Sequence, residues 1–165
     1  MKHTNEDFFK LFGHISVFFA TWDMLTNILI FRLVKNPNID SRMTLGEKIK
    51  YLGHLDSNEV DDLDVLKDIK DFIEESARDV SQERNRYIHD QWIFKESDID
   101  EGKIERSEIV LKPESKDLHL KTTRFSIADI EKFLVKVGAC QKKTTDLIAR
   151  LPVVKTKVHW NGIIK

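Results

Sequence analysis

The sequence holds a single cysteine, Cys140, among its 165 residues. One thiol excludes an internal disulfide framework and is typical of proteins from a reducing compartment. Internal repeats, low-complexity tracts and long linkers are also missing, and a chain of this length can bury one sizeable core. We therefore expect a single cytoplasmic domain over residues 1–165, with Cys140 as a small core residue.

Several classes of site leave no signature. There is neither a glycine-rich phosphate loop nor a serine nucleophile elbow. The histidines His54, His119 and His159 do not cluster with cysteines or carboxylates at zinc-ligand spacings. Residues 98–102 superficially resemble a calcium loop but lack its twelve-residue ligand pattern, which predicts a hairpin turn instead. We expect no metal ion and no cofactor.

A strong charge of one sign is missing as well. The net charge is −1, so no global field attracts the chain to nucleic acid. Locally, acids dominate residues 56–75 and bases dominate the chain after Lys136. Each run fits a solvated helix face, although the basic run could also approach a phosphate backbone.

The apolar stretch at residues 15–31 has the length of a membrane-spanning segment. Polar side chains interrupt it, Asp23 among them, whereas a spanning helix needs about 20 mostly apolar residues. Acidic and polar residues at 5–7 also break the pattern of a signal peptide. The sequence therefore predicts a buried helix and no membrane association.

Four helices are predicted from apolar residues at three- and four-residue steps, over about 5–34, 44–55, 59–89 and 126–151. Thr44 and Glu47 form a capping box, and Ser126 caps the last helix. Alternating stretches between about 92 and 123 predict a small antiparallel β-meander. Short connections favour an up-down four-helix bundle. The fold class is therefore mainly α, with the meander inserted before the last long helix as a flap against one end.

The third predicted helix ends in Arg84-Asn85-Arg86-Tyr87-Ile88-His89. Asn85 and His89 share a helix face, while Arg84 continues the apolar stripe, where a cation needs a partner, a cleft or a second subunit. Arginine matches phosphate oxygens, and histidine transfers protons near neutral pH. Together they fit attack by an RNA 2′-hydroxyl on the adjacent phosphate. His89 would move the proton, Arg84 would stabilise the charge, and Asn85 would orient His89 or bind a phosphate oxygen.

This segment resembles the motif of the HEPN superfamily: arginine, four to six residues, then histidine near the end of a long helix, often with a polar residue after the arginine. The strand with Trp92 is similar to members in which a hairpin follows the motif helix. The resemblance covers the four-helix pattern over residues 5–151 and rests on few identities. It implies a metal-independent endoribonuclease, often a toxin or defence protein, in which two copies form one cleft. Arg84, Asn85 and His89 are the catalytic residues that it implies, whereas Arg86 and Tyr87 fill variable positions.

Two other functions stay open. Some HEPN proteins do not cleave RNA, so the chain is alternatively a non-catalytic binding or regulatory module, or a nuclease silenced by an antitoxin or another regulatory protein. A structural interpretation pairs Arg84 with an acid and uses His89 to cap its helix. His14 and Asp23 are weaker site candidates on the first helix. The apolar surface of that helix is too broad for one neighbour, so we expect it to form the homodimer interface.

Overall fold

The computed structural model describes residues 3–37, 39–40, 42–112 and 117–153, with the side chains of 88–89, 109–112 and 117–119 left out. Its first half contains α1 (Asn5–Leu33), α2 (Leu45–His54), α3 (Leu63–Phe72), the π-helical turn η1 (Ile73–Ala77) and α4 (Arg78–His89). Its second half contains β1 (Gln91–Ile93), α5 (Glu96–Asp100), β2 (Lys103–Lys112), β3 (Asp117–Ser126) and α6 (Ile127–Arg150). The protein is therefore mainly helical with a small antiparallel sheet, as the sequence predicts.

The core lies where α1 packs along α6. On α1 the buried residues follow a helical period, and they are Phe8, Ile15, Phe19, Trp22, Thr26, Leu29, Ile30 and Leu33. The indole Nε1 of Trp22 donates a hydrogen bond to Thr144 Oγ1 at 3.0 Å, inside the core. Cys140 is buried beside it on α6, as predicted. Thr144 Oγ1 in turn donates to the Cys140 carbonyl at 2.8 Å, so these buried polar groups are hydrogen-bonded to one another.

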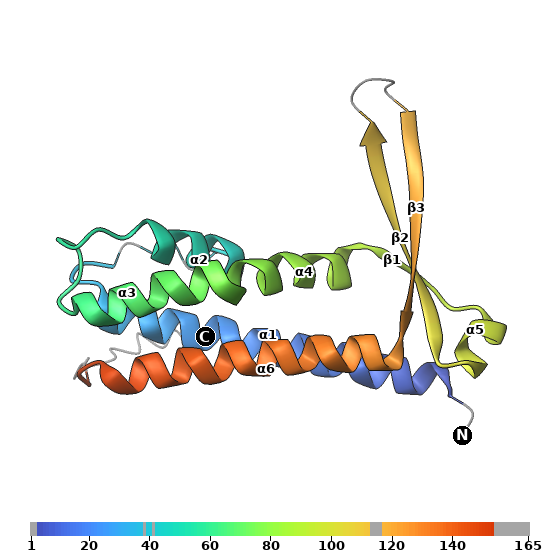
Figure 1. Cartoon of the computed structure of the whole chain (residues 1–165), viewed down its shortest axis with the longest axis horizontal. Helices are drawn as coiled ribbons and strands as arrows, with labels where there is room; N and C mark the ends of the chain where they lie inside the picture. The colour runs from blue at the N-terminus through green and yellow to red at the C-terminus, as the bar shows by residue number, and fades with distance from the viewer. Residues whose placement is uncertain (1–2, 38, 41, 113–116, 154–165) are drawn as a thin grey trace, which may run out of the picture.

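The helices do not alternate strictly in direction, so the predicted up-down order is wrong. In the contacts between α1 and α6 the residue numbers increase together along both helices, from Phe18 with Gln141 to Arg32 with Ile148. The two helices are therefore parallel neighbours (Figure 1). The cause is the connection after α1, which turns back so that Thr44 lies beside the middle of α1 instead of its end. Periodicity reports which face of a helix is buried, but not which way its neighbour runs.

The segments α3, η1 and α4 form one continuous rod, close to the predicted helix over 59–89. The rod begins at Leu63, because the Asp62 side chain accepts a hydrogen bond from the Val65 N–H at 2.9 Å. The π turn was not predicted. It is marked by the Arg78 N–H, which donates to the Ile73 carbonyl five residues back. Such turns are rare and occur frequently at functional sites.

The sheet has the strand order β1-β2-β3, and both pairs are antiparallel. The predicted meander is therefore present, and it lies at one end of the helical body, as predicted. The β2–β3 hairpin projects from one end of the helical body, and only its base lies against the helices (Figure 1). The hairpin turn predicted at 98–102 is wrong. Residues 96–100 form α5, and Gly102 follows it with a φ of 70°.

Helix α1 is long and apolar enough to cross a membrane, with a mean hydropathy of 1.3 over its most apolar stretch, one third of which is buried. The core helix of a soluble protein meets the same criterion. The observed packing fits that interpretation, because Asp23 on α1 is held by Lys48 of α2.

Candidate functional site

The three candidate residues stand on α4, whose last turn leads directly into the sheet. Arg84, Asn85 and His89 all lie in this helix, and Asp90 is its C-cap, with an N–H that donates to the Arg86 carbonyl. The predicted position at a helix end is therefore confirmed. The His89 side chain lies outside the described part of the structure, so its place relative to Arg84 stays a prediction.

The Arg84 guanidinium is half-buried between α1 and α2. Its Nη1 donates to Asn85 Oδ1 at 3.2 Å, and its central carbon lies 5.8 Å from the centre of the Phe19 ring. Its Nε is buried without a hydrogen-bond partner. No acid among the described residues forms an ion pair with it. The acid partner of the structural interpretation is thus absent from the described part, and the guanidinium keeps unused donors.

Arg84 lines a cavity of about 380 Å³, which we call the Arg84 pocket. Ser16, Phe19, Ala20 and Asp23 of α1 form one wall, and Met43, Thr44 and Leu45 form the other. The Asp23 carboxylate accepts two hydrogen bonds from Lys48 Nζ, at 2.8 and 2.9 Å. Its charge is therefore matched by Lys48, which leaves the Arg84 charge available to an anion.

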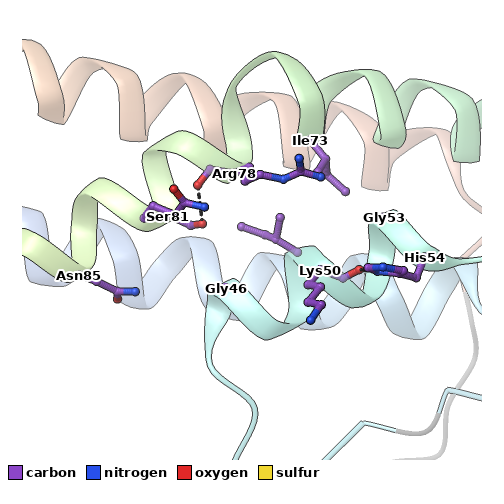
Figure 2. A pocket seen from close by; sticks show the side chains of 10 residues that line it. Gly46, Lys50, Gly53, His54, Ile73, Arg78, Ser81 and Asn85 are labelled. Carbon is purple, nitrogen blue, oxygen red and sulfur yellow. Dashed lines mark hydrogen bonds between the residues drawn. The ribbon is translucent and has the colours of Figure 1, made fainter. Parts of the chain in front are cut away.

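Asn85 is exposed and lines a second cavity on the other side of α2, which we call the α2–α4 groove (Figure 2). The two residues are in contact, but they open onto different surfaces. This follows from their adjacency, since successive residues point about 100° apart around a helix. The structure therefore brings Arg84 and Asn85 together as neighbours, not as two walls of one pocket.

An aromatic cluster fixes the end of α4. The Tyr87 ring stacks on Phe133 with 4.4 Å between centroids, and its carbonyl accepts a hydrogen bond from Trp92 Nε1 at 3.0 Å. Burial raises the pKa of the Tyr87 hydroxyl above its ordinary value of 10.0. Tyr87 is thus a neutral residue of the core.

A buried ion pair completes this support. Arg106 of β2 reaches Asp90 Oδ2 at 3.3 Å and covers the Phe125 ring at 4.5 Å. Only 7% of Arg106 is exposed, so its charge pairs with Asp90 inside the protein and is not presented to solvent. The pair ties the sheet to the helix end that carries His89.

Sequence reasoning missed the α2–α4 groove, a cavity of about 370 Å³. Its lining residues are Gly46, Ile49, Lys50, Gly53, His54, Ile73, Arg78, Ser81, Gln82 and Asn85. One signal was present in the sequence. Gly46 and Gly53 are seven residues apart, which places both on one face of α2, where neither contributes a side chain.

The weaker candidates gain little. His14 is exposed on α1 and lines none of the described cavities, while Asp23 is held by Lys48. Of the three histidines without zinc spacing, His54 lines the groove, and the side chains of His119 and His159 lie outside the described residues. Among the residues described, no three His, Cys, Asp or Glu side chains are placed to hold a metal ion.

Comparisons of the chain with models of protein families, with curated proteins and with solved structures find no match.

Proposed function

We propose that the protein is a HEPN-like, metal-independent endoribonuclease that works as a homodimer in the cytoplasm. The observation that carries the proposal is the Arg84 guanidinium, which is half-buried, lacks an acidic partner among the described residues and opens into a pocket. A cation in that position costs free energy unless an anion joins it. The motif spacing to His89 and the sheet that follows the motif helix support the same assignment.

The chemistry is a transfer within the RNA chain. His89 removes the proton of a 2′-hydroxyl, whose oxygen attacks the adjacent phosphorus. Arg84 donates hydrogen bonds to the phosphate oxygens on which negative charge develops. The bond to the 5′-oxygen breaks, and that oxygen takes up a proton. The products are one fragment with a 2′,3′-cyclic phosphate and one with a free 5′-hydroxyl.

The outer face of α1 supports the dimer. Gly13, Val17, Ala20, Met24, Asn27 and Phe31 follow one another at alternating steps of four and three residues, the spacing of a coiled-coil seam. Val17, Met24 and Phe31 are 62%, 54% and 57% exposed, so the described fold leaves the seam uncovered. We name this set the α1 seam.

The α1 seam is complementary to itself. In an antiparallel pair centred on residue 22, Phe31 faces Gly13 of the second copy and Met24 faces Ala20. These two layers each join one large and one small side chain, which permits close packing, and the third layer pairs Val17 with Asn27. Ala20 also lines the Arg84 pocket, so this pairing would bring the two Arg84 pockets toward one another. A second copy is therefore the partner that best fits this face.

Incubation with RNA in the presence of EDTA tests the proposed activity. The parent should cleave single-stranded RNA to 2′,3′-cyclic phosphate ends, while His89→Ala and Arg84→Ala should each lose at least a hundredfold in rate. His14→Ala is the matched control and should cleave like the parent, because His14 lies outside the described cavities. No cleavage by the parent at micromolar concentration would reject the enzyme and favour a non-catalytic binding module.

The same cleavage assay would also reveal a regulatory partner. If the chain is a toxin or defence nuclease that an antitoxin silences, then the isolated protein is active and the purified complex is not. Cleavage by the chain alone, with loss of activity on adding the co-purified partner, would identify that arrangement.

A further inference from the structure

The α2–α4 groove carries positive charge without a matching negative one. Lys50 lines it from α2, and Arg78 lines it from the first turn of α4. None of its lining residues is an aspartate or glutamate. Neither Lys50 nor Arg78 forms an ion pair with a residue that the structure describes. The acid of α2, Glu47, lies outside the groove lining, and its carboxylate is held by Thr44, whose N–H donates to it at 2.7 Å.

Two other polar side chains of the groove also offer donors. Gln82 and Asn85 contribute side-chain amides on the α4 wall. The Nδ1 of His54 lies 2.6 Å from the Lys50 carbonyl. Because a carbonyl only accepts, Nδ1 carries a proton, and Nε2 of the neutral ring is then an acceptor, so His54 adds no donor toward a phosphate. Figure 2 shows the Arg78 side chain extending along the groove toward Ile73, with Asn85 at the opposite end.

Two features of the backbone open this space. Gly46 and Gly53 present no side chain, and a Cβ at Gly46 would meet nothing within 4 Å. Two glycines inside a ten-residue helix weaken it, so the open face has a cost in stability. On the opposite wall, the π turn η1 ends immediately before Arg78. The turn therefore affects the direction in which the Arg78 side chain projects from the helix.

These observations select a ligand with several acceptor oxygens and negative charge. A phosphate group fits, since a guanidinium, an ammonium and side-chain amides all donate to phosphate oxygens. The floor of the groove is apolar, because Ile49 and Ile73 are buried beneath it. Charge-assisted hydrogen bonds are stronger beside such a surface than in open water.

We propose that the α2–α4 groove binds phosphate groups, and that its ligand is the backbone of the single-stranded RNA presented to Arg84. The identity of the ligand rests on the function proposed above, whereas the phosphate chemistry rests on the groove itself. Arg84 and Asn85 are in contact and line the two cavities, and the linings also include the neighbouring residues Leu45 and Gly46 at the start of α2. An RNA strand that crosses this point places one phosphate at Arg84 and a neighbouring one in the groove.

Fluorescence anisotropy with a labelled single-stranded 2′-O-methyl RNA 12-mer tests the groove, because this RNA lacks the 2′-hydroxyl that the proposed cleavage requires. The double variant Arg78→Gln/Lys50→Gln should bind at least tenfold more weakly than the parent. The slope of log affinity against log salt should fall by about 1.4, at roughly 0.7 for each lost phosphate contact. Gly46→Leu, which fills the groove without changing charge, should weaken binding in the same direction.

Lys67→Gln/Lys132→Gln is the matched control, because it removes two exposed cations that lie outside the groove. It should bind within twofold of the parent. If the groove variants bind RNA as the control does, the proposal is wrong. Circular dichroism checks that each variant is folded.

A second titration with inorganic pyrophosphate separates the sources of phosphate. If the parent binds pyrophosphate, the groove variants do not, and RNA affinity is the same in all, then the site takes a small phosphorylated molecule and the RNA assignment is wrong. RNA binding through the groove with no cleavage rejects the nuclease and keeps the groove. Cleavage by the parent, with RNA affinity unchanged in the groove variants, keeps the nuclease and rejects RNA binding by the groove.

Discussion

The Lys48 ammonium donates to both carboxylate oxygens of Asp23, at 2.8 and 2.9 Å, and joins α2 to α1 beside the Arg84 pocket. The two partners differ in burial: the Lys48 side chain is 3% exposed and that of Asp23 is 36% exposed. The lysine therefore depends on the aspartate more than the aspartate depends on the lysine, because only the lysine would be left as a buried, unpaired charge.

This difference predicts unequal effects of two mutations. Asp23→Asn should lower the free energy of unfolding by about 3 kcal/mol, since it leaves the Lys48 charge buried without a counter-charge. Lys48→Met should cost roughly 1 kcal/mol, because it removes the buried charge and leaves a carboxylate that water reaches. Urea denaturation of both variants measures the two values. Equal losses, or a larger loss for Lys48→Met, would contradict the pairing described here.

The α1 seam predicts an oligomeric state that depends on its apolar residues. Val17→Glu and Met24→Glu should each shift the protein from dimer to monomer, because a charge inside an apolar interface is desolvated. Neither side chain is buried in the monomer, so both variants should fold. Light scattering after size-exclusion chromatography measures the mass. Val135→Glu is the control, because Val135 lies on α6 and is 72% exposed. This variant should stay dimeric. A monomeric parent would exclude the shared-cleft model.

The buried tyrosine predicts a loss of stability in alkaline solution. Burial raises the pKa of Tyr87 above 10.0, so above pH 10 the unfolded chain loses a phenol proton that the folded chain retains. The contribution of Tyr87 to the free energy of unfolding is therefore fully present below pH 10. It falls as the pH rises above 10, by about 1.4 kcal/mol per pH unit. Tyr87→Phe should reduce that slope.

The second tyrosine provides the comparison. Burial also raises the pKa of Tyr51, but its side chain is only partly buried. Tyr51→Phe should therefore change the alkaline slope less than Tyr87→Phe does. Thermal unfolding followed between pH 9 and pH 11 measures both, and the same slope in parent and Tyr87→Phe would refute the assignment.

Gly102 predicts a local effect of the backbone. Its φ of 70° lies in the left-handed region, and a Cβ there would come within 2.7 Å of the His3 ring. Gly102→Ala should cost roughly 1–2 kcal/mol for the backbone alone. Gly138→Ala is the matched control, since its Cβ would meet nothing within 4 Å and alanine favours the helix. It should stabilise the protein, and a similar outcome at both glycines would contradict the geometry at Gly102.

The local signals in the sequence were reliable where the structure depends on neighbouring residues. Both predicted caps are present: Thr44 pairs with Glu47 and Ser126 pairs with Asp129, each through reciprocal hydrogen bonds. The long helices and the three strands occupy nearly the predicted residues. The exceptions are local as well, since α5 replaces a predicted turn and η1 interrupts a predicted regular helix.

The candidate site was predictable only in part. Spacing placed Arg84 and Asn85 at the end of a long helix, and the structure confirms that position. It did not reveal that Asn85 faces a groove with Arg78 and His54, because those residues meet only after α2 packs against α4. Sequence separation hides such a site, since no spacing connects its α2 residues with its α4 residues.

Caps and the three- to four-residue spacing of apolar side chains were enough to specify the helices, because both act within a few residues of chain. The parallel packing of α1 on α6, the pocket around Arg84 and the groove beside Asn85 arose only in the folded molecule. They depend on where the connection between α1 and α2 places Thr44, and that position is set by the packing free energy of the whole core.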